Sequence, residues 1–131
     1  MSQDSSFSFI PPSSRSKPSD TSINSIYGSY SYTLPEDKSF GSYIGDYSHS
    51  TSGYVSDIRY FLSGTDAGSF SINSSNGTLS LNTSLDYETK TSYTFNVNVR
   101  GWATYYYSVP WGGYGSSPRT DSKSQSVSVY V

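Results

Sequence analysis

The chain has 131 residues, of which 14% are charged, and its formal net charge at pH 7 is −2. This length suits one domain with a single hydrophobic core, and the absence of basic clusters argues against binding to nucleic acid. There is no cysteine, which excludes disulfides and thiolate metal sites. No apolar run approaches the ~20 residues that span a bilayer. Serine and tyrosine are common and alanine is scarce, so we expect an all-β protein.

Residues 1–25 are rich in serine and proline, and two interpretations stay open. A flexible linker fits the composition. The alternation of Phe7 and Phe9 with serines instead fits an arm that adds a strand to the sheet of another subunit. The start of the chain lacks the continuous apolar core of a signal peptide, and we expect a piece of a longer exported protein.

Residues 26–131 are expected to form the folded domain, with strands where apolar and polar residues alternate. The alternation is cleanest at 93–99, and Asn76-Gly77 predicts a hairpin turn. We expect Tyr93, Phe95, Val97 and Val99 to face one core, and Val127, Val129 and Val131 to share one side of a final strand. Other strands are expected at 30–34, 42–47, 58–62, 70–72 and 78–81, with a polar loop at 48–53. Seven short strands predict an antiparallel Greek-key sandwich of immunoglobulin-like size.

An aromatic-rich insert at 101–125 precedes the final strand. It is too long for a simple turn, so it is either an extended β-ribbon or a structured loop. Exposed aromatic rings make large, stiff contact surfaces, but these rings would equally well cover the open end of a small sandwich. The insert carries Trp102, Tyr105, Tyr106, Tyr107, Trp111 and Tyr114, which we treat, with Phe7 and Phe9, as a candidate interaction surface.

Enzyme chemistry is not indicated. His49 is the only histidine, and we expect it to lie solvated in the 48–53 loop, with nothing to orient it for a catalytic triad. Zinc spacing and a phosphate-binding glycine loop are also absent. Asn73, Asn76 and Asn82 each begin a glycosylation triplet, which in a serine-rich chain also arises by chance.

The paired acids of Leu85-Asp86-Tyr87-Glu88 lie between two predicted strands. Calcium takes six to eight oxygen ligands and favours carboxylates, so a cation site is one interpretation. The other is a structural corner in which the acids accept hydrogen bonds from backbone amides.

Several segments resemble a cadherin repeat in order and spacing. Residues 32–37 (Tyr-Thr-Leu-Pro-Glu-Asp) resemble the first-strand signature, and the family's next four motifs are resembled by residues 41–44, 58–62, 68–72 and 76–79. Residues 85–88 closely resemble its Leu-Asp-x-Glu signature. The resemblance implies a sandwich and a Ca²⁺ site with Glu36, Asp86 and Glu88 as ligands.

The sequence departs from that resemblance at other expected acids. Thr51 and Gly53 stand where the family has an Asp-x-Asp loop, and Arg100-Gly101 replaces a further acid. We expect these positions to meet Glu36 and Asp86, so the metal site would be a half-site needing carbonyls, water or a neighbouring domain.

Three functions remain open. The leading hypothesis is a non-catalytic adhesion or structural module of an extracellular surface protein, stiffened by Ca²⁺ and joined to neighbouring domains or subunits. The second is a filament or matrix subunit that assembles through the N-terminal arm and the aromatic insert. The third is a carbohydrate-binding module that stacks surface glycans on the aromatic insert.

Overall fold

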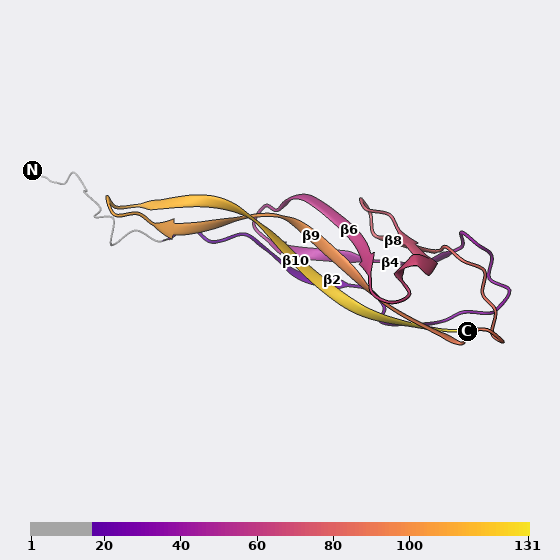
Figure 1. Cartoon of the computed structure of the whole chain (residues 1–131). Helices are drawn as coiled ribbons and strands as arrows, with labels where there is room; N and C mark the ends of the chain where they lie inside the picture. The colour runs from indigo at the N-terminus through magenta and orange to yellow at the C-terminus, as the bar shows by residue number, and fades with distance from the viewer. Residues whose placement is uncertain (1–16) are drawn as a thin grey trace, which may run out of the picture.

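The computed structural model describes residues 17–131, so Phe7 and Phe9 lie outside the described residues (Figure 1). Within this range the chain is almost wholly β, as expected, with nine strands and one short 3₁₀ helix at Ala67–Ser69. The strands are β2 (Ser22–Tyr27), β3 (Ser31–Thr33), β4 (Tyr43–Asp46), β5 (Ser48–Ser52), β6 (Ser56–Ser63), β7 (Phe70–Ile72), β8 (Thr78–Leu81), β9 (Ser92–Ser108) and β10 (Tyr114–Tyr130).

The strands form two layers. One sheet has the order β3-β10-β9-β6, in which β3 is parallel to β10 and the other pairs are antiparallel. The facing layer contains β4-β8-β7 and the separate antiparallel pair β2-β5. Only Tyr47 separates β4 from β5, so the β2-β5 pair continues the facing layer along the molecule.

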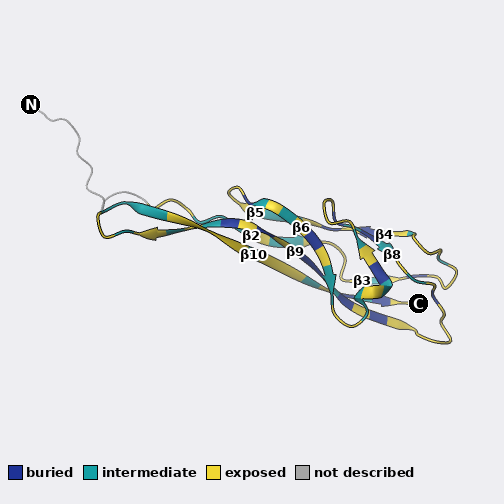
Figure 2. Cartoon of the chain, turned by 45° about the horizontal axis from the view of Figure 1, so that its top comes forward, coloured by how far each residue is buried: buried dark blue, intermediate teal, exposed yellow. Residues whose placement is uncertain are grey.

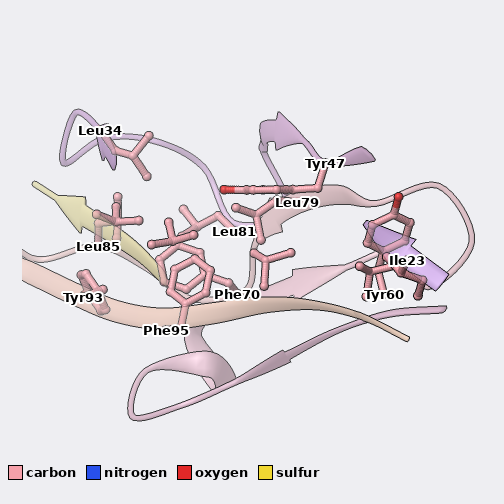
Figure 3. Close-up of a cluster of buried hydrophobic side chains, with 14 of the residues drawn as sticks. Ile23, Leu34, Tyr47, Tyr60, Phe70, Leu79, Leu81, Leu85, Tyr93 and Phe95 are labelled. Carbon is pink, nitrogen blue, oxygen red and sulfur yellow. The ribbon is translucent and has the colours of Figure 1, made fainter. Parts of the chain in front are cut away.

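The predicted core positions of β9 are confirmed. Tyr93, Phe95, Val97 and Val99 are all buried, and Figure 3 shows how the rings of Phe70 and Phe95 lie together. Those two rings stack with centroids 4.5 Å apart. From β10, Val127 and Val129 are buried and Val131 is half-buried. The alternation of apolar side chains in β9 and β10 therefore builds the floor of the core.

Tyr47 fills the middle of the facing layer with a polar tip. Its ring is buried, and its hydroxyl donates to the Ser29 carbonyl at 2.5 Å and accepts from the Tyr32 hydroxyl at 3.1 Å. Burial is the main cause of the raised pKa of Tyr47, and the hydrogen bond from Tyr32 raises it further. Tyr47 thus shows how a tyrosine can serve in the core, with its ring buried and its hydroxyl hydrogen-bonded.

The Asn76-Gly77 hairpin joins β7 to β8 as expected. Gly77 has a φ of 75° and is packed so closely that a Cβ would overlap the Tyr47 backbone oxygen. The side-chain oxygen of Asn73 accepts from the amides of Ser75 and Asn76 at 2.8 and 3.0 Å. The turn chemistry predicted from sequence is present.

Two strands occupy segments that the sequence did not predict as strands. β5 replaces the expected polar loop at 48–53, and β2 begins inside the expected linker at 1–25. β5 pairs only with β2 and its side chains are exposed or half-buried. Backbone pairing forms such a strand without the apolar alternation on which the prediction relied.

The aromatic insert is a β-ribbon, the first of its two predicted alternatives. β9 and β10 stay paired from Tyr130↔Ser92 to Tyr114↔Ser108, and the final strand begins at Tyr114 rather than at residue 126. The two strands run well past the sandwich before they turn (Figure 1). Beyond Ala103, exposed and half-buried residues replace the buried ones (Figure 2).

Candidate functional site

The acids of the predicted metal site lie at one end of the sandwich, near Val131, and we call Glu36, Asp86 and Glu88 the acidic end. Leu85 is buried and fixes the start of the turn that carries Asp86 and Glu88. Glu36 follows β3, and its Oε1 accepts from the Tyr87 amide at 2.8 Å. This contact joins segments that are 51 residues apart in the chain.

Asp86 organises its own turn. Its Oδ1 accepts from the Glu88 amide at 3.1 Å, and its Oδ2 accepts from the Thr89 hydroxyl at 2.8 Å. Its backbone carbonyl accepts from the amides of Thr89 and Lys90 at 3.0 and 2.9 Å. Asp86 therefore does what the structural-corner interpretation requires, but Glu36, and not Glu88, provides the second carboxylate that accepts from a backbone amide.

The structure brings the carboxylate of Glu36 to the turn that carries Asp86, and leaves Glu88 exposed. The Glu88 carboxylate makes no hydrogen bond or ion pair within residues 17–131. In the same range, no three His, Cys, Asp or Glu side chains are close enough together to hold a metal ion. A carboxylate has about four lone-pair positions, so hydrogen bonding leaves Glu36 and Asp86 able to ligate. The donor set fits Ca²⁺ in chemistry but is incomplete in number.

The positions expected to complete this set lie elsewhere, which corrects the sequence interpretation. The Val131 amide donates to the Thr91 carbonyl beside the acidic end. Gly101 lies ten residues after Thr91 along the chain and pairs with Asp121 of β10. At about 3.3 Å per residue that separation is roughly 30 Å. Thr51 pairs with Ile23, whose amide donates to Asp121, and Gly53 packs against Thr21, which bonds Thr104, so both lie at the same end as Gly101. The missing acids at Thr51, Gly53 and Gly101 therefore remove no ligands from the acidic end.

The opposite end, which we call the ribbon end, is closed by the buried residues Val55, Gly101 and Ala103. A Cβ on Gly101 would lie 2.7 Å from Val55 Cγ1 and 3.1 Å from Ile58 Cγ1. These aliphatic carbons, together with the Ser56 carbonyl oxygen at 3.1 Å, fill the space that an acidic side chain would need. These residues do not fit a cation site.

The ribbon end leads into the aromatic positions. Trp111 at the turn is 83% exposed, and Trp102, Tyr105 and Tyr107 are about half exposed. The Tyr105 and Tyr107 rings stack with centroids 6.3 Å apart. Tyr106 and Tyr114 are half-buried. The predicted interaction residues from β9 and β10 therefore share one projecting ribbon, although whether they bind anything stays a prediction.

His49 is not a solvated loop residue, contrary to the sequence prediction. It lies half-buried in β5, and its Nδ1 is 2.6 Å from the hydroxyl of the buried Tyr60. Burial raises the pKa of Tyr60, and the tautomer of the His49 imidazole sets which of the two groups donates the hydrogen bond. Sequence reasoning missed the contact because β5 carries no apolar alternation.

The comparison with known families identifies the chain. Residues 30–107 match the cadherin domain. The chain belongs to the cadherin family. The cadherin match spans β3 to most of β9 and includes Glu36, Asp86 and Glu88. Among curated proteins, no match is found.

Solved cadherin structures share the fold. The chain is 24% identical to Drosophila N-cadherin EC1-3, with a TM-score of 0.59 over 88% of this chain and 34% of that one. It is 22% identical to mouse cadherin-23 EC22-24, with a TM-score of 0.55 over 86% of this chain and 34% of that one. It is 21% identical to human protocadherin-24 EC1-2, with a TM-score of 0.53 over 86% of this chain and 43% of that one. The chain thus spans less than half of each of these multi-repeat structures. Within residues 17–131, no helix is both long and apolar enough to cross a membrane.

Proposed function

We propose that this cadherin domain is a non-catalytic adhesion or structural module of an extracellular surface protein. Its acidic end contributes Glu36, Asp86 and Glu88 to a Ca²⁺ site that a neighbouring domain or subunit completes. The observation that carries the proposal is the Glu36–Tyr87 hydrogen bond, which places two carboxylate-bearing segments together beside Val131. Bound calcium would tie these segments to the neighbour and stiffen the junction.

The proposal needs oxygen ligands from outside the described residues. The three carboxylates fall short of the six to eight oxygens that Ca²⁺ takes. Waters fill the remainder in the isolated chain, so its affinity is weaker than that of the completed site. Both oxygens of Asp86 already hold the turn in shape, which gives the ion a pre-formed side of the site.

Thermal melting at rising CaCl₂ concentration, up to several millimolar and with a chelator as reference, tests the proposal. Calcium is expected to raise the melting temperature, because a ligand that binds only the folded state stabilises it. Glu88→Gln is the matched variant, since Glu88 has no partner within residues 17–131. It should leave the calcium-free melting temperature unchanged and reduce the calcium shift.

The control is Asp57→Asn, which removes an exposed acid of β6 paired with Arg59 at 3.0 Å. Its φ of 53° is one that asparagine tolerates. This variant should keep the full calcium shift. If wild type shows no shift at millimolar calcium, or if Glu88→Gln shifts as much as wild type, the calcium proposal fails while the fold stands.

The projecting ribbon favours a second role in self-assembly. Its exposed rings offer contact area at low entropic cost. Replacing Trp111 with Ala should weaken self-association if the rings dock on a neighbouring subunit, and light scattering would measure it. The same variant on a glycan array tests the carbohydrate-binding alternative, which an array without hits would remove.

A further inference from the structure

The outer edge of β10 is largely unpaired. β3 covers it only at Ser128–Tyr130, where the Ser128 amide donates to the Tyr30 carbonyl at 2.9 Å. Backbone groups alternate in direction along an antiparallel strand. The even-numbered residues from Ser116 to Ser126 therefore also turn their N–H and C=O groups away from β9. In the part of the chain that is described, no other strand pairs with them.

The side chains along this edge are small on one face and charged on the other. Even-numbered positions carry the small, exposed residues Thr120, Ser122 and Ser124. Odd-numbered positions share the face of the buried Val127, and among them are Asp121 and Lys123. An unpaired edge of this kind is a template for another strand.

We propose that this edge pairs with the same edge of a second copy, antiparallel about a two-fold axis at Ser122. The axis places Asp121 of each copy opposite Lys123 of the other, so the charge pair occurs twice. Asp121 Oδ2 accepts from the Ile23 amide at 2.8 Å, which holds the carboxylate in place and leaves Oδ1 for the lysine. The result is one sheet that continues across both copies.

Two other symmetric registers are worse. An axis at Asp121 would set that acid against itself and Arg119 against Lys123, and like charges directly opposite are destabilising. An axis at Thr120 would set Pro118 against Ser122, whose carbonyl would then face a residue without an N–H.

An axis at Ser122 avoids the unpaired carbonyl that Pro118 would otherwise cause. It sets Pro118 against Ser126, whose carbonyl already accepts from the Gln125 side-chain amide at 3.0 Å. The missing proline N–H thus faces an acceptor that is already occupied. Pairing ends at Ser126 because β3 occupies the edge from Ser128 onward.

Sedimentation equilibrium of the full chain, from micromolar to near-millimolar concentration, tests this dimer. Ser122→Pro removes an N–H that points away from β9, so the hairpin keeps its own bonds, as it does at Pro118. By symmetry the dimer loses this bond twice, and the dissociation constant should rise at least about tenfold. Ser122→Ala keeps the N–H and should match wild type.

A charge exchange tests the register independently. Lys123→Asp alone and Asp121→Lys alone each set like charges opposite one another, and each should weaken the dimer. Mixed together, the two variants regain opposite charges at both positions and should form a heterodimer. Circular dichroism melts check that every variant is folded.

Proline and lysine also occur at sheet edges because they prevent association. The competing explanation is therefore that Pro118 and Lys123 keep this edge of β10 unpaired. If wild type stays monomeric throughout the concentration range, or if Ser122→Pro dimerises as wild type does, the proposal is overturned. A mixture that remains monomeric while wild type dimerises would overturn the Ser122 register. These outcomes do not depend on calcium, so they separate from failure of the proposed function.

Discussion

The acidic end and the ribbon end close the same sandwich in different ways. At the acidic end, polar turns cover the core, and the carboxylates of Glu36 and Asp86 bind backbone amides. At the ribbon end, Val55 packs against Gly101 with no room for another side chain. One end offers oxygen ligands to a cation and the other is filled with hydrocarbon.

The difference in chemistry between the two ends suits them to different roles. In the proposed function, the carboxylates of the acidic end bind a cation beside Val131, and a neighbouring domain or subunit completes the site. The ribbon end extends β9 and β10 outward, and residues 20–21 support that extension. Thr21 exchanges hydrogen bonds with Thr104, and the Asp20 carboxylate accepts from the Tyr106 amide at 2.9 Å.

The largest effect is expected from placing an acid at the ribbon end. Gly101→Asp forces a Cβ against Val55 Cγ1, at 2.7 Å, and buries an unpaired charge. Chemical denaturation should show a loss of about 3 kcal/mol or more, and the variant should gain no calcium response. Gly68→Asp is the control, because Gly68 is exposed and a Cβ there meets nothing within 4 Å. A tolerated Gly101→Asp that binds calcium would contradict the hydrocarbon-filled ribbon end.

The next effect separates the core from the ribbon on one strand. Phe95→Ala removes a buried ring stacked on Phe70 and should cost about 3–5 kcal/mol. Tyr105→Ala removes a ring that is 43% exposed and should cost less than about 1 kcal/mol. Urea unfolding of both variants measures the difference. Equal losses would mean that the ribbon belongs to the same cooperative core.

A small effect on stability is expected at the acidic end without calcium. Asp86→Ala removes the acceptor for the Glu88 amide and the Thr89 hydroxyl, and should cost about 1 kcal/mol in the presence of chelator. The loss should grow once calcium is added, because the variant also removes a ligand. A loss that calcium does not change would assign Asp86 to the structural corner alone.

Much of this fold could be predicted from sequence because its signals are local. Alternation placed the core face of β9, and the Asn-Gly pair placed the hairpin of β7 and β8. β5 could not be predicted in this way, since Ser48–Ser52 carries no apolar alternation and depends on pairing with β2.

The site was predicted only in part, because spacing along a chain does not give position along a sandwich. The resemblance grouped Thr51, Gly53 and Gly101 with Glu36 and Asp86, whereas β9 separates the two groups by roughly 30 Å. The ribbon shows the same limit. The alternation of the ribbon continues that of the core. Tyr105 and Tyr107 are exposed because the facing layer ends before them, and the sequence of β9 does not encode where that layer ends.

The most direct test is a backbone-amide NMR spectrum of the full chain recorded during calcium titration. The account predicts concentration-dependent shifts at Tyr87 and Glu88, whose amides bond the acidic-end carboxylates. The amides of Thr51, Gly101 and the ribbon should not move. Shifts centred on the ribbon end, or no shift at Tyr87 and Glu88 at millimolar calcium, would contradict the assignment of the cation site to the acidic end.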